Sequence, residues 1–293
     1  MELKVRLEAG LGDAVAASMV IKVLENHGHN ITVSVNSNRT FVYECAGVPT
    51  TPMEPSVPFH RWRYYDDDWG DMSKPVWQSS KPMMAFRDDV FPKLEPASAL
   101  WSELCAIRVS AREKIKPDVA KEVKSFLDGL PKPILALHTA GNSFASKKNL
   151  SHDVSIGVMD RWLQQTKGSI VQINADKGEP SHQHPHVKTH RSWRRIGLDW
   201  LCGLFYEADL MIGVDSGPFH LAAFTDVPCL GVFRQIQPIH CAIPNPNAHY
   251  LVSDLHHETW EKEKHDWQFI EYRGPEPDAD DVFAAAMEVM TQP

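Results

Sequence analysis

The order of apolar and polar positions along the chain predicts an α/β fold. An alternating segment at residues 4–8 is followed by a glycine turn, an apolar helix over about residues 13–27 and a second strand at 30–36. Strand–helix–strand order is typical of parallel sheets, because the helix carries the chain back across one face of the sheet. We therefore expect the chain to open with a βαβ unit.

The second half repeats this order with strands that are apolar throughout. The pattern predicts helices at 154–166, 198–208 and 278–290, and strands at 134–140, 169–175, 209–214 and 228–233. Strands without polar alternation indicate a sheet that is covered by helices on both faces. A parallel sheet in the middle of a second α/β domain is the expected result.

The length of 293 residues fits two domains, at roughly 100 to 200 residues each. The Gly- and Pro-rich segment 128–133 is the best candidate for a linker. We expect domains at 1–130 and 131–275, followed by a C-terminal helix within 276–293. Between about 51 and 96 the periodicity fails, and the high aromatic content of this insertion favours a binding loop over a disordered tract.

Composition narrows the class of protein. The net charge of −8 argues against broad neutralisation of nucleic-acid phosphates. Five cysteines, an odd number without metal-ligand spacing, indicate reduced thiols. The sequence shows neither a signal-like start nor a stretch of about 18 apolar residues, so we expect a cytoplasmic protein without a transmembrane segment.

Three loops that follow predicted strands carry unusual polar residues, and ligands of open α/β sheets bind at such strand ends. In the loop 215–220, Gly217 allows close approach of the backbone to a ligand, and Pro218 suits the first helical turn, whose free N–H groups favour phosphate. Asp215, Ser216 and His220 lie beside this bend. A helix cap and a core histidine would explain the same residues equally well.

The loop 138–148 carries short polar side chains followed by two lysines. Hydroxyl and amide donors with a nearby cation suit a diphosphate, although an ordinary solvated loop has the same composition. The residues concerned are Thr139, Asn142, Ser143, Lys147 and Lys148.

The loop 8–15 contains Gly10 and Gly12 but has Val15 where a dinucleotide-binding fingerprint has its third glycine, which argues against an NAD site. Asp13 stands at the start of the following helix. It could cap that helix or accept a proton from an attacking hydroxyl.

Together these loops resemble glycosyltransferase family 9, the ADP-heptose:lipopolysaccharide heptosyltransferase family. The resemblance rests on GLGD, on HTAGNS followed by two lysines, and above all on ADLMIGVDSGPFHLAAFTDVPCLGVF. It covers about residues 133–233 and the first 36, but not 51–127. After the last strand, Arg234 to Gln237 replace the usual glycine, proline and threonine, which leaves the base and the sugar open.

The resemblance implies the GT-B fold, in which two Rossmann-like domains with parallel sheets face each other across a cleft. It implies that the second domain holds a nucleoside-diphosphate sugar, that the first is on the acceptor side, and that the last helix packs back on the first domain. Transfer would be inverting, with no essential metal and no cofactor besides the donor substrate. Catalytic roles fall on Asp13 as general base and on Lys147 or Lys148 at the diphosphate. Donor contacts fall on Gly12, Thr139, Asn142, Ser143, Asp215, Ser216, Gly217, Pro218 and His220.

Other polar clusters are weaker candidates. In the aromatic insertion, rings and carboxylates suit a sugar acceptor, although packing of the loop on its own domain is an equal alternative. These candidate acceptor residues are Trp62, Tyr65, Asp68 and Trp69. The Asp66–Asp68 pattern lies outside any predicted strand, which argues against a metal site there. For the histidine tract 182–186 a solvated surface is favoured over zinc.

Three classes of function stay open. The first is a glycosyltransferase acting on a lipopolysaccharide core or another glycan, with peripheral contact at the inner face of a membrane left open. The second is a transferase of the same fold acting on a hydroxymethylated base in viral DNA, where nucleic acid would be only the acceptor. The third is a noncatalytic nucleotide-sugar-binding protein or an epimerase-like enzyme. Oligomeric state is not encoded in any motif.

Overall fold

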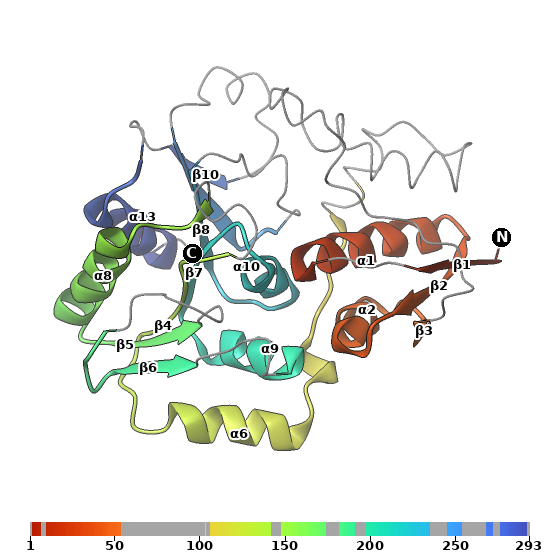
Figure 1. Cartoon of the computed structure of the whole chain (residues 1–293), viewed down its shortest axis with the longest axis horizontal. Coiled ribbons are helices and arrows are strands. Elements are labelled where there is room, and N and C mark those ends of the chain that lie inside the picture. The colour runs from red at the N-terminus through yellow and green to blue at the C-terminus, as the bar shows by residue number, and fades with distance from the viewer. Residues whose placement is uncertain are drawn as a thin grey trace. The chain divides into compact units, whose positions relative to one another are not determined.

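The computed structural model describes residues 2–6, 10–53, 103, 106–141, 148–173, 182–190, 197–234, 245–253, 268–271 and 276–291 (Figure 1). The chain divides into two compact units, one of residues 1–110 with 239–244 and one of residues 111–238 with 245–293. Sequence patterning placed the division at residue 130. The structure assigns 111–130 to the second unit, because helix α6 (Pro117–Leu127) packs on helix α9 (Leu198–Glu207).

The first unit has a three-stranded sheet in the order β1-β2-β3, and all its strands are parallel. Helix α1 is buried along most of its length, as an apolar connection between two parallel strands should be. The elements are β1 (Glu2–Arg6), α1 (Leu11–Asn26), β2 (Asn30–Val35), η1 (Ser37–Arg39), α2 (Thr40–Ala46) and β3 (Thr50–Pro52). The βαβ start predicted from the sequence is confirmed.

The second unit contains a seven-stranded parallel sheet in the order β10-β9-β8-β7-β4-β5-β6. The chain starts in the middle at β4, builds outward through β5 and β6, then returns to the other side of β4 with β7. The strands are β4 (Ile134–His138), β5 (Ser169–Ile173), β6 (Val187–His190), β7 (Leu210–Val214), β8 (Cys229–Phe233), β9 (Ala248–Val252) and β10 (Gln268–Glu271). The reversal puts a topological switch point between β4 and β7, where open α/β sheets bind ligands.

Helices cover this sheet as the apolar strands predicted. Helix α9 packs on β4, while α8 (His152–Arg161) and α13 (Ala279–Thr291) lie side by side and share an apolar core with the strands (Figure 1). Every residue of β4, β5, β7, β8 and β9 is buried. Short elements complete the unit: η2 (Arg112–Lys114), the π-helical turn η3 (Trp162–Thr166), α10 (Gly217–Leu221) and η4 (Ala222–Phe224).

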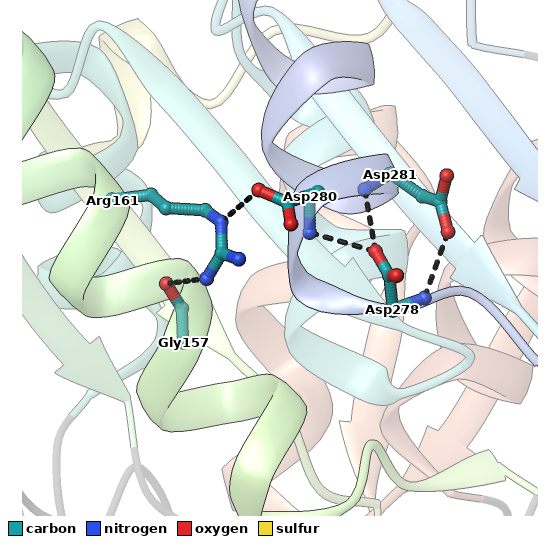
Figure 2. Close-up of polar contacts among 5 residues, drawn as sticks. All are labelled: Gly157, Arg161, Asp278, Asp280 and Asp281. Carbon is teal, nitrogen blue, oxygen red and sulfur yellow. Dashed lines mark hydrogen bonds and ion pairs between the residues drawn. The ribbon is translucent and has the colours of Figure 1, made fainter.

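A polar clamp joins α8 to the start of α13 (Figure 2). Arg161 bonds Asp280 through Nε and donates from Nη1 to the carbonyl oxygen of Gly157 at 3.1 Å. Asp278 caps α13, because its Oδ1 accepts from the backbone N–H groups of Asp280 at 2.8 Å and Asp281 at 2.9 Å. The carboxylate of Asp281 accepts the N–H of Asp278 in return.

Close packing accompanies this clamp. A Cβ atom built on Gly157 would lie 2.6 Å from the Cβ of Ala279, so glycine sets how near the two helices approach. The C-terminal helix, which the family resemblance suggested would pack on the first domain, is part of the core of the second unit. No helix within the described ranges is long and apolar enough to cross a membrane.

Candidate functional site

Polar residues gather where β4, β7 and β8 end, on both sides of the switch point. Thr139 follows β4, Asp215 and Ser216 follow β7, and Arg234 follows β8. Thr139, Asp215 and Ser216 are 2%, 6% and 8% exposed, which is unusual for polar residues in loops. The buried polar side chains that the sequence placed at ligand-binding strand ends are thus brought to one edge of the sheet.

Asp215 is the centre of a buried charged cluster. Its Oδ2 pairs with Nζ of Lys148 at 2.5 Å, and its Oδ1 is 2.8 Å from Nε2 of His220. The Lys148 side chain is only 13% exposed. Burial alone would raise the pKa of Asp215, but the hydrogen bond and charge of His220, together with Lys148, hold it well below its usual range. The carboxylate therefore stays ionised and fixes the lysine and the histidine.

Two buried hydroxyls beside this cluster make no hydrogen bond within the described part of the chain: Oγ1 of Thr139 and Oγ of Ser216. Ser216 occupies the N-cap position of α10, yet its side chain does not cap the helix. The capping role considered from the sequence is therefore not realised. Buried hydroxyls without partners cost free energy, and a ligand that accepts hydrogen bonds from them would recover it.

The backbone around these hydroxyls is fixed from the β4 side. The N–H of Gly141 donates to Oδ1 of Asn149 at 2.8 Å, and the N–H of Leu150 donates to the carbonyl of Thr139 at 3.0 Å. A Cβ on Gly141 would lie 3.3 Å from the carbonyl oxygen of Asp215 and 3.8 Å from the Cβ of Ser216. The loops after β4 and β7 therefore approach each other closely at Gly141, and Lys148 comes from the same loop as Gly141.

Helix α10 has only five residues, and packing of the aromatic side chain of Phe219 holds it in place. Phe219 lies over two glycines that are direct partners in β7 and β8, Gly213 and Gly231. A Cβ on Gly231 would lie 2.6 Å from Cζ of Phe219, so only glycine leaves room for the ring. Phe219 also packs edge-on against Phe233 and Tyr250. This seat fixes Ser216 and His220 on either side of it.

Arg234 is a site residue that sequence reasoning did not select. Its Nη1 donates to the carbonyl of Asn149 at 2.5 Å, its Nη2 pairs with Glu276, and its side chain is 13% exposed. The buried Nε has no hydrogen-bond partner among the residues that the structure describes. The only sequence signal was an arginine directly after a wholly apolar strand, at the point where the chain departs from the family motif.

His138, the last residue of β4, adds a buried neutral group under the cluster. It is 1% exposed, and its Nδ1 donates to the carbonyl of Ile173 on β5. Burial lowers its pKa to about 4, although the hydrogen bond to Ile173 opposes this shift. The imidazole is therefore uncharged at neutral pH.

In the first unit, Asp13 lies in the first turn of α1 next to Gly12. Its Oδ2 accepts the backbone N–H of Gly10 at 2.9 Å, so it serves as a helix cap in the structure. The buried hydroxyl of Tyr43 is close enough for the charge of Asp13 to raise its pKa, after burial as the main cause. The N–H of Gly10 therefore fixes the orientation of the Asp13 carboxylate.

Several predicted site residues lie outside the described part of the chain. These are Trp62, Tyr65, Asp68 and Trp69 of the aromatic insertion and Asn142, Ser143 and Lys147 of the second loop. In the histidine tract, His182 pairs with Asp160 at 2.8 Å and His184 accepts the N–H of His186. Within the described ranges no three histidine, cysteine, aspartate or glutamate side chains are grouped to hold a metal ion.

Comparison with known proteins gives a family match over part of the chain and a fold for nearly all of it. Residues 194–268, which include the Asp215–His220 motif, match glycosyltransferase family 9 (heptosyltransferase). No curated protein sequence matches the chain. The resemblance to family 9 stated from the sequence is confirmed over this segment.

Solved structures extend the likeness to nearly the whole chain. A glycosyl transferase family 9 protein from Veillonella parvula is 14% identical with a TM-score of 0.60, and 99% of this chain aligns with 97% of that one. The E. coli ADP-heptose lipopolysaccharide heptosyltransferase II is 12% identical with a TM-score of 0.57, and 85% of this chain aligns with 90% of that one. The E. coli heptosyltransferase WaaC with ADP is 10% identical with a TM-score of 0.56, and 98% of this chain aligns with 98% of that one. At these identities the comparisons show the fold, which is the predicted GT-B class with parallel sheets.

Proposed function

We propose that this protein is an inverting glycosyltransferase that moves a heptose-like sugar from a nucleoside-diphosphate sugar to a hydroxyl group of a glycan acceptor, such as a lipopolysaccharide core. The observation that carries the proposal is the buried Lys148–Asp215–His220 cluster, beside which the hydroxyls of Thr139 and Ser216 have no hydrogen-bond partner in the described part of the chain. The match of residues 194–268 to family 9 and the GT-B neighbours support it.

The donor diphosphate would bind at the switch point of the second unit. The hydroxyls of Thr139 and Ser216 would donate to phosphate oxygens, and Gly217 would let the backbone approach them. Lys148 supplies a positive charge that Asp215 orients within 2.5 Å. As the bond between the anomeric carbon and the phosphate oxygen breaks, negative charge builds up on the departing nucleoside diphosphate. A fixed lysine and fixed donors stabilise that charge without reorganising.

The acceptor hydroxyl must lose its proton as it attacks. Asp13 is the proposed general base, because its Oδ2 is tied to the N–H of Gly10 and the carboxylate is thereby oriented. The reaction is balanced within these groups: the acceptor oxygen forms the new glycosidic bond, Asp13 takes the proton, and the nucleoside diphosphate leaves with the bonding electron pair. We propose that no metal ion is needed for this step.

Donor binding is tested first, by thermal shift with ADP, UDP, GDP, CDP and dTDP, each in EDTA and in magnesium. A ligand at 100 times its Kd stabilises the folded state by about 2.7 kcal/mol, which gives a readable shift. We expect one nucleoside diphosphate to stabilise the protein equally with and without magnesium. No shift with any of them would overturn the donor site, and a shift only in magnesium would overturn the metal-independent mechanism.

Transfer is then tested with Asp13→Asn. The variant keeps the helix-start geometry and should retain donor binding while losing transfer by two orders of magnitude or more, on the order expected for a general base. Asp118→Asn, which removes the first-turn acid of α6, is the matched control and should transfer normally. Retained transfer in Asp13→Asn would remove the base assignment. Release of free sugar without any acceptor would favour an epimerase-like enzyme.

A further inference from the structure

The charges at the strand ends balance each other before any ligand binds. Lys148 is neutralised by Asp215, and Arg234 is neutralised by Glu276. The two pairs differ in accessibility, because Asp215 is 6% exposed and Glu276 is 52% exposed. Asp215 is held by two partners inside the protein, whereas Glu276 reaches Arg234 from an exposed position just before α13. Glu276 is therefore the carboxylate that can separate from its arginine and become hydrated with the smaller loss of free energy.

Arg234 is connected to the donor site by a short chain of contacts. Its Nη1 donates to the carbonyl of Asn149, and the side chain of Asn149 accepts the N–H of Gly141. Gly141 in turn lies close to Asp215 and Ser216, since a Cβ built on it would meet the carbonyl oxygen of Asp215 at 3.3 Å and the Cβ of Ser216 at 3.8 Å. The strands β4, β7 and β8 are neighbours in the sheet. The guanidinium group therefore belongs to the same edge as the unpartnered hydroxyls.

At the end of each of these three neighbouring strands, one buried donor has no partner among the residues that the structure describes. These donors are the hydroxyl of Thr139 after β4, the hydroxyl of Ser216 after β7 and the Nε–H of Arg234 after β8. A residue that served only to tie loops together would be expected to use its buried donors, since an unpaired one destabilises the fold. Three such donors in a row match the several acceptor oxygens of a diphosphate.

We propose that Arg234 is a further anion-binding residue of the donor site, that it binds the diphosphate of the nucleoside-diphosphate sugar, and that Glu276 is a built-in counter-ion which the diphosphate displaces. This inference rests on the proposed function and deepens it. Before binding, Glu276 neutralises the guanidinium group. The arriving diphosphate takes over its Nη2 and engages the vacant Nε, in the two-pronged geometry that guanidinium offers to phosphate oxygens. Affinity for the donor is then set partly by competition with Glu276.

The experiment measures the Kd of inorganic diphosphate and of ADP for the unmodified protein and four variants by titration calorimetry. Arg234→Gln should weaken both about tenfold to a hundredfold, the usual loss for a charge-assisted hydrogen bond. Arg234→Lys keeps the charge but not the two-pronged geometry, so its Kd values should lie between those of the unmodified protein and Arg234→Gln. Glu276→Gln should bind both ligands about two- to fivefold more tightly, because a competing and partly exposed ion pair is removed.

Asp280→Asn is the matched control. It removes the carboxylate of a second arginine pair, Arg161–Asp280, at the start of α13, and its Kd values should stay within about twofold of the unmodified protein. The melting temperature of each variant is measured alongside. A purely structural clamp would make Glu276→Gln less stable without tightening either ligand. Should Arg234→Gln fail to fold, the tightening in Glu276→Gln carries the test.

The outcomes separate this inference from the proposed function. Unchanged Kd values in Arg234→Gln and Glu276→Gln overturn the role of Arg234 and leave the donor site intact. Absence of binding of both ligands to the unmodified protein overturns both proposals. Arg234-dependent binding of inorganic diphosphate in a protein that transfers no sugar from any donor supports the anion site and overturns the transferase.

Discussion

Arg161 and Arg234 each hold a carboxylate near the start of α13, yet their surroundings differ. Arg161 lies on the outer helix layer, where it uses Nε for Asp280 and Nη1 for the carbonyl of Gly157 (Figure 2). Arg234 lies at the end of β8, is less exposed, and leaves its Nε without a partner in the described structure. The Arg161–Asp280 pair joins two helices, whereas Arg234 retains an Nε–H donor that no described residue bonds.

The same contrast extends to the neighbours of each arginine. Around α13, the three aspartates cap one helix and bond to one another or to Arg161, and none of them is buried. At the strand ends, His138, Thr139, Asp215 and Ser216 are buried, and two of their hydroxyls are unpaired. Between these two regions, the aspartates at α13 are bonded within the chain, whereas two hydroxyls at the strand ends have no partner in the described part of it. The following predictions test whether the two regions differ in this way.

The largest effect is expected from His138 and concerns pH. Its folded pKa of about 4 lies below the unfolded value of about 6.5, so the unfolded chain binds more protons between these values. Its contribution is therefore fully present above pH 6.5 and is lost as the pH falls towards 4. In His138→Asn, the loss of unfolding free energy between pH 7.5 and 4.5 should shrink by about 2 to 3 kcal/mol.

The measurement is urea denaturation of both proteins at the two pH values. His190 and His249 also have lowered pKa values because of burial, so the variant should retain part of the acid sensitivity. The stabilisation from Asp215, whose pKa is depressed, is present at both pH values and is lost only below about pH 4, where the carboxylate of the unfolded chain becomes protonated. An identical loss in both proteins would show that His138 titrates normally in the fold.

A smaller effect compares two glycines, one in each region. Gly231→Ala places a Cβ 2.6 Å from Cζ of Phe219 and 2.7 Å from Cε2 of Phe233, and Gly157→Ala places one 2.6 Å from the Cβ of Ala279. Each should cost about 1 to 3 kcal/mol through overpacking. In Gly157→Ala this is offset by about 1 kcal/mol, because alanine favours helix.

The two variants should separate in ligand binding. Displacement of Phe219 moves α10 and with it Ser216 and His220, so Gly231→Ala should bind ADP more weakly in conditions where it is folded. Gly157→Ala should bind ADP like the unmodified protein. ADP affinity is measured by calorimetry, and the melting temperatures are measured beside it. Equal losses of ADP affinity in both variants would mean that packing in the helix layer affects the strand-end site as strongly as packing beneath α10.

Much of the fold could be predicted from the sequence because its central strands are apolar throughout. The strands expected at 134–140, 209–214 and 228–233 appear as β4, β7 and β8 within two residues at each end. The edge strands β6 and β10, and β9 beside β10, were not predicted. Their segments mix polar and apolar positions, and pairing with a neighbour rather than their own pattern decides that they form strands.

The site was predicted in part for a related reason. A polar loop after an apolar strand marks a strand end, and this selected Thr139, Asp215, Ser216 and His220. It could not show that Lys148 pairs with Asp215, or that Glu276 meets Arg234, because these contacts join segments 67 and 42 residues apart in the chain. The choice between Lys147 and Lys148 is not settled by the contact of Lys148, since Lys147 lies outside the described residues.

The smallest effect is expected at the α13 cap. Asp278→Ala removes the acceptor for the N–H groups of Asp280 and Asp281 and should lower the unfolding free energy by about 1 kcal/mol, the usual cost of losing an N-cap. ADP affinity should be unchanged, because every group that Asp278 bonds lies on the helix layer. Weaker ADP binding in Asp278→Ala would instead mean that the cap positions Glu276, two residues earlier, and through it Arg234. The helix layer would then set the affinity of the strand-end site, and the contrast between the two arginines would be one of degree.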